Sequence, residues 1–91
     1  MTEQELLEEV KEATNFSSEH QKGFVEKWLN FAKGYMANGG VADEALYDEC
    51  SVGVIAAIIT DMIDTGGITS LTDKLVAQLA LTHPRKEVWY V

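Results

Sequence analysis

Four stretches of the chain place apolar residues three or four positions apart, the spacing of one helix face. The most apolar stretch is SVGVIAAIITDMI, residues 51–63, which carries no charge before Asp61. On a helical wheel its valines, isoleucines and methionine cover about half of the circumference, and small or polar residues fill the rest. The pattern predicts a largely buried helix. It is too short to span a bilayer, which takes about 20 apolar residues.

The same helix has a narrow second face, which we call the small-residue seam. We expect the broad apolar face to hold the subunit together and the seam to contact either the next helix or a neighbouring copy. The seam consists of Leu46, Cys50, Gly53, Ala57 and Asp64. The first four of these are predicted interface residues.

Capping patterns predict the first helix. Thr2 and Glu5 form a capping box that starts a helix near residue 3. We expect this helix to end at about Ala13. Its apolar stripe is narrow, so we expect it to be peripheral. The stripe consists of Leu6, Leu7 and Val10.

The remaining helices are predicted from similar signals. A second helix spans about 19–37, with its inward seam at Phe24, Trp28, Phe31 and Tyr35 and with Val25, Leu29, Ala32 and Met36 beside it. Asp43 caps a third helix over about 44–64, and Ser70 starts a fourth that ends near Leu81. We therefore expect an all-α fold. It is a small bundle of about four helices with a long, largely buried third helix, forming one domain (1–84) with an extended C-terminal tail (85–91).

Composition limits the function classes. A chain of 91 residues makes one domain, and its single cysteine rules out an internal disulfide. The net charge of −8 argues against a protein that neutralises nucleic-acid phosphates. The acidic N-terminus lacks a signal segment, so we expect synthesis and use in a cytoplasm, without a membrane.

No arrangement of reactive side chains predicts an enzyme, a cofactor or a metal site. His20, His83 and Cys50 are far apart in the sequence, and Cys50 is expected to be a small core residue. Asp61 and Asp64 stand one helical turn apart, which fits a cation or acid–base site but also a solvated or interface role. Ser70 stands at a helix start after two glycines and resembles the prosthetic-group serine of acyl carrier proteins, whose motif is Asp-Ser-Leu. Here Thr69 replaces the aspartate, and a helix cap explains the serine as well.

Both ends of the chain offer contact surfaces. The acidic first helix is a solvated face, a docking surface for a basic partner, or a wall that repels DNA. At the other end, Trp89, Tyr90 and Val91 need cover, either from their own core or from a neighbouring chain.

The order of these patterns resembles a known family. The opening LLEEVKEA is followed by a Ser/Thr-rich turn, a helix ending FAKGYM, the turn NGGV, an apolar helix and LVAQLAL. This resembles the small head–tail connector (adaptor) proteins of tailed phages and prophages. Those often have an acidic stretch where this chain has 17–20, and an aromatic-rich third-helix end where it has 61–64.

The resemblance implies a structural protein made in the host cytoplasm and placed at the head–tail junction of the virion. Its copies would form a ring below the portal protein and extend the channel, through which DNA passes without specific binding. The ring would dock a tail or stopper protein. The alternative is a small acidic adaptor or regulator that binds a protein partner through helix-in-groove contacts.

Overall fold

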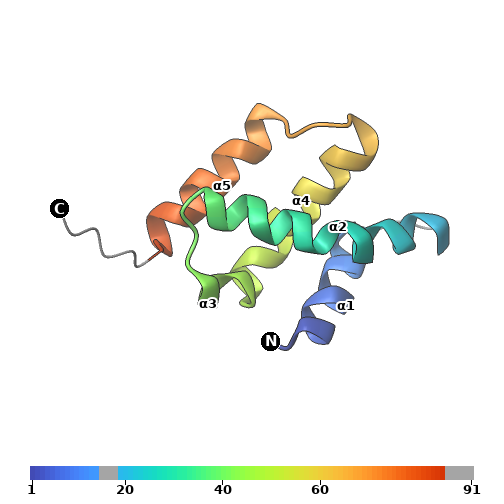
Figure 1. The fold of residues 1–91 in the computed structure, drawn as a ribbon, viewed down its shortest axis with the longest axis horizontal. Helices are drawn as coiled ribbons and strands as arrows, with labels where there is room; N and C mark the ends of the chain where they lie inside the picture. The colour runs from blue at the N-terminus through green and yellow to red at the C-terminus, as the bar shows by residue number, and fades with distance from the viewer. Residues whose placement is uncertain (15–18, 86–91) are drawn as a thin grey trace.

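The fold is a set of helices packed around one central helix, α4. In the computed structural model, which describes residues 1–14 and 19–85, the helices are α1 (Glu3–Thr14), α2 (Glu19–Asn38), α3 (Asp43–Leu46), α4 (Glu49–Asp64) and α5 (Ser70–Thr82). Each of the other four contacts α4. In Figure 1, α2 crosses α4, and α5 returns beside α4 after a loop. The predicted all-α class is confirmed for the described residues.

The broad apolar face of α4 forms the centre of the core. Ile55, Ile58 and Ile59 are fully buried. The other fully or nearly buried side chains of the core come chiefly from α1 and α2, with Val76 and Leu79 from α5. Burying one such side chain contributes about 1.5–3 kcal/mol.

The prediction of one third helix over 44–64 is wrong, because this stretch forms two helices, α3 and α4. Asp48 has an extended backbone and its side chain accepts a hydrogen bond from the backbone N–H of Glu49, at 2.7 Å, so a new helix begins there. The buried hydroxyl of Ser51 donates to the carbonyl of Ala45 and fixes the corner between α3 and α4. Polar caps thus interrupt an apolar pattern that continues across the break.

The first helix is not peripheral as predicted. Leu6 and Val10 are fully buried and Leu7 is nearly so, and α1 packs against both α2 and α4. The capping box is confirmed by two hydrogen bonds: the N–H of Thr2 donates to Glu5 at 3.0 Å, and the N–H of Glu5 donates to Thr2 at 3.1 Å. The stripe is narrow, but the whole stripe is covered because α1 sits between two helices.

In α2, the buried line lies beside the predicted aromatic seam. Trp28 and Tyr35 are half-buried and Phe31 is 40% exposed. These rings contact one another along the edge of the core. The fully or nearly buried positions are the smaller residues next to them: Val25, Leu29, Ala32 and Met36. Smaller side chains let α1 and α4 approach α2 closely.

The end of α5 is tied to the turn after α2. Gly40 takes the left-handed backbone conformation, with φ of 97°. Beyond it, Val41 and Pro84 form an isolated bridge, in which the N–H of Ala42 donates to His83 at 2.9 Å and that of Arg85 donates to Gly40 at 2.7 Å. This bridge fixes where the chain leaves the bundle.

Candidate functional site

An open apolar groove of about 410 Å³ lies between α4 and α5. Gly53 and Ala57 form its floor on the α4 side, where small side chains leave space between the helices. Leu71 and Leu75 of α5 stand opposite them, and Ala13 at the end of α1 closes one side. We call this feature the α4–α5 groove.

Leu71 is the most unusual residue of the groove. Its side chain is 69% exposed although it is a large apolar group. Exposed single leucines are common on protein surfaces, but this one also lines an apolar groove, which makes it a candidate contact residue. The fold of the chain leaves this side chain largely uncovered within the described residues.

The structure places two of the predicted interface residues in the groove and two outside it. Gly53 and Ala57 line it, as members of the small-residue seam facing α5. Leu46 is buried in the core at the end of α3. The prediction that Cys50 is a core residue is wrong, because it is exposed in the first turn of the new helix α4. The predicted residues Trp89, Tyr90 and Val91 lie outside the described residues.

Asp61 closes one end of the groove. Its carboxylate accepts two hydrogen bonds from Thr69, from the backbone N–H at 3.0 Å and from the hydroxyl at 2.9 Å. Burial raises the pKa of Asp61, but hydrogen bonds from Thr72 and Thr69 outweigh this and the pKa is lowered overall. Asp64 is exposed, and no group of three potential metal ligands includes the two aspartates in the described part of the chain. Asp61 instead fixes the start of α5 against the end of α4.

The capping residues differ from those predicted. Thr69 caps α5, since its hydroxyl accepts from the N–H of Thr72 at 3.3 Å, and Ser70 is the exposed first residue of the helix. Before α3 the cap position is Ala42, which makes no side-chain hydrogen bond, so Asp43 is not the cap. Thr69 and Ser70 are adjacent residues that can both cap a helix, so the sequence alone does not choose between them. The start of α3 lies one residue before the predicted start, which is a common difference at helix ends.

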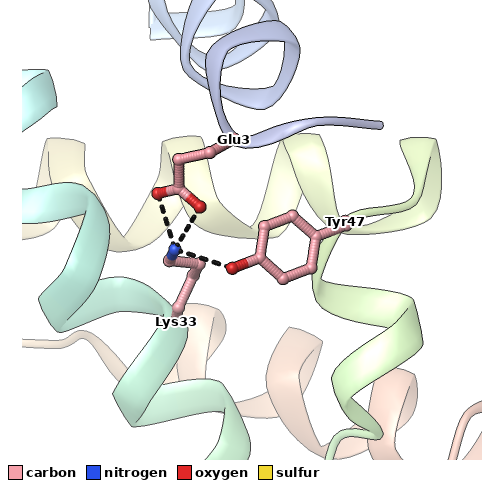
Figure 2. A network of polar contacts seen from close by, with 3 residues as sticks. All are labelled: Glu3, Lys33 and Tyr47. Atoms are coloured by element: carbon pink, nitrogen blue, oxygen red, sulfur yellow. Dashed lines mark hydrogen bonds and ion pairs between the residues drawn. The ribbon is translucent and has the colours of Figure 1, made fainter.

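A second polar cluster joins three distant parts of the chain, as Figure 2 shows. The ammonium of Lys33 donates to both carboxylate oxygens of Glu3, at 2.6 and 2.7 Å, and to the hydroxyl of Tyr47 at 3.1 Å. The hydrogen bond from Lys33 lowers the pKa of Glu3. Burial lowers the pKa of Lys33, but its contacts with Glu3 and Tyr47 outweigh this and raise the pKa overall. The cluster fastens α1 to α2 and to the α3–α4 corner.

Reactive groups do not converge elsewhere in residues 1–14 and 23–85. No three His, Cys, Asp or Glu side chains in this part are placed to hold a metal ion. His83 is half-buried after α5, and its carbonyl accepts the Ala42 bond described above. The His20 side chain is not among those described.

No helix in the described part of the chain combines the length and the apolarity needed to cross a bilayer. Comparison of the chain with protein-family models, with curated proteins and with solved structures finds no match. The resemblance to head–tail connectors therefore rests on the order of the sequence patterns.

Proposed function

We propose that this chain is a structural subunit of a phage or prophage head–tail connector. Copies form a ring below the portal protein, extend the DNA channel and dock a tail or stopper protein. The observation that carries the proposal is the α4–α5 groove with its exposed wall residue Leu71. A subunit whose fold leaves an apolar groove open is suited to bind another protein chain there.

The charge of the surface supports the same role. The net charge is −8, and the outward side of α1 exposes Glu8, Glu9 and Glu12. A channel wall of this sign repels DNA phosphates, so that DNA slides without being retained. The acidic face also allows the second candidate, a small acidic adaptor whose groove accepts a helix of a different protein.

Mass measurement in solution, combined with electron microscopy over a concentration series, separates the two. The connector proposal predicts a concentration-dependent rise from the 10.1 kDa monomer to ring-shaped particles. It also predicts that Leu71→Ser shifts this equilibrium at least tenfold toward monomer. The matched control is Leu81→Ser, which changes a leucine that is 81% exposed but outside the groove. A strict monomer at all concentrations contradicts the connector and favours the adaptor.

A further inference from the structure

We propose that residues 86–91 of one copy bind in the α4–α5 groove of a neighbouring copy. This inference rests on the proposed function, because it names the occupant of the groove in the assembly. The segment reads KEVWYV, and its last four residues are Val88, Trp89, Tyr90 and Val91. Three observations lead to this occupant: where the chain leaves the bundle, how far it reaches, and what the groove accepts.

The chain leaves the bundle on the side of α5 that faces away from the groove. Residue 85 is held beside Gly40 by the backbone hydrogen bond of the Val41–Pro84 bridge, and its guanidinium donates to the carbonyl of Ala37 at 3.3 Å. A Cβ atom added to Gly40 would lie 3.7 Å from the Cβ of Ala80, so this turn packs on the Ala80 side of α5. Ala80 lies nine positions after Leu71, which at about 100° per residue is the opposite side of the helix.

Distance disfavours a chain's own groove as the site of Trp89, most strongly at the Leu71 end. Leu71 lies about 16 Å back along α5 from Thr82, since a helix rises about 1.5 Å per residue. Trp89 follows Arg85 by four residues, which span at most about 14 Å even when fully extended. The segment would also have to pass round a helix about 10 Å wide. The groove of a second copy is under no such restriction.

The groove suits large apolar side chains. The groove is open, and its volume of about 410 Å³ leaves room for a large side chain. Glycine and alanine on the α4 side make room, and Leu71 and Leu75 supply an apolar wall. An extended segment also places alternate side chains on one side, so Trp89 can enter while Val88 and Tyr90 face the rims.

A contact of this kind determines the type of assembly. The donor surface is residues 86–91 and the acceptor surface is the groove, so the two surfaces are different. Different surfaces make a head-to-tail contact, which closes into a ring when the rotation between copies allows it. A groove that instead met the same groove of a second copy would give a closed pair.

The first experiment measures binding independently of ring formation. The full chain carrying Trp89→Ala and Tyr90→Ala, which we call the tail variant, is titrated into a fluorescently labelled KEVWYV peptide and the anisotropy is followed. We expect saturable binding, weakened at least tenfold by adding Leu71→Ser and unchanged by adding Leu81→Ser. Both leucines are exposed, so neither change disturbs the core. The inference is overturned if the peptide does not bind, or if Leu71→Ser and Leu81→Ser weaken its binding equally.

The second experiment tests the head-to-tail geometry. Ala57→Phe fills the groove, and circular dichroism checks that the helix content is kept. Alone, this variant and the tail variant should each remain monomeric. Mixed one to one, they should form a heterodimer and nothing larger, because only one donor–acceptor pair remains intact. Rings from the tail variant alone would overturn the inference and leave the connector proposal standing. Peptide binding by a wild-type chain that never forms rings would support the inference and contradict the connector proposal.

Discussion

Asp61 joins the end of α4 to the start of α5, because its carboxylate accepts two hydrogen bonds from Thr69. Its spacing to Asp64 fits a paired-carboxylate site, yet only Asp61 reaches Thr69 across the loop between α4 and α5. Sequence spacing places two side chains on one helix face, but it does not show which of them meets another element. That depends on the path of the loop that follows, which contains Gly66 with φ of 76°.

Asp61→Ala should lower the free energy of unfolding by about 1 kcal/mol at neutral pH, because two hydrogen bonds to a partly exposed carboxylate are lost. The folded-state pKa of Asp61 is lowered, so its contribution is present above its ordinary pKa near 4 and is lost as the pH falls through the lowered value. Urea denaturation of the wild-type protein and of Asp61→Ala should therefore show a difference in the free energy of unfolding that shrinks below about pH 4. Asp64→Ala is the control and should change stability by less than about 0.5 kcal/mol. An equal effect of the two substitutions would contradict this assignment.

At the scale of elements, the corner between α3 and α4 is the feature that apolar periodicity alone does not predict. Apolar spacing continues from Leu46 into the next helix, and no glycine or proline interrupts it. The break depends on the side chains of Asp48 and Ser51, which bond to backbone groups in a turn. Such residues also occur inside helices, so their presence alone does not fix a boundary. The break also explains why Cys50, expected in the core, is exposed.

The two aspartates around this corner give a direct test of capping. Asp48→Ala removes the side chain that accepts from the first N–H of α4, and it should cost about 1 kcal/mol. Asp43→Ala removes the predicted cap of α3, which makes no capping hydrogen bond because the cap position is Ala42. It should change stability by less than about 0.5 kcal/mol. Thermal unfolding should show a larger loss of stability for Asp48→Ala than for Asp43→Ala. A larger loss for Asp43→Ala would contradict the positions at which α3 and α4 begin.

The glycines of α2 and of the turn after it should respond to alanine in opposite ways. Gly34→Ala places a methyl group in open space inside a helix, so it should stabilise the protein by about 0.5–1 kcal/mol. Gly39→Ala places its Cβ 2.9 Å from the Cγ1 atom of the buried Val76, which is closer than such contacts allow, so one of the two groups must shift. This change should cost about 1–3 kcal/mol. Chemical denaturation measures both, and stabilisation by Gly39→Ala would show that α5 does not pack against this turn.

At the scale of the whole molecule, the sequence predicts the helical class and half of the groove. Wide apolar periodicity places Ile55, Ile58 and Ile59 in the core, and the small-residue seam marks Gly53 and Ala57 as a surface of close approach. The other wall depends on how α5 returns beside α4, which is a long-range property. The Glu3–Lys33–Tyr47 cluster is also invisible in the sequence, because its members are separated by 30 and 14 positions.

We expect copies of the chain to cover the α4–α5 groove when they assemble. Hydroxyl-radical footprinting of the wild-type protein tests it most directly, by comparing the oxidation of Leu71 and Leu81 between low micromolar and near-millimolar concentration. Both leucines are largely exposed in the single chain, at 69% and 81%, so both should react in dilute solution. We expect oxidation of Leu71 to fall severalfold as the concentration rises while that of Leu81 stays constant. Unchanged oxidation of Leu71, or an equal fall for both leucines, would show that assembly does not cover the groove.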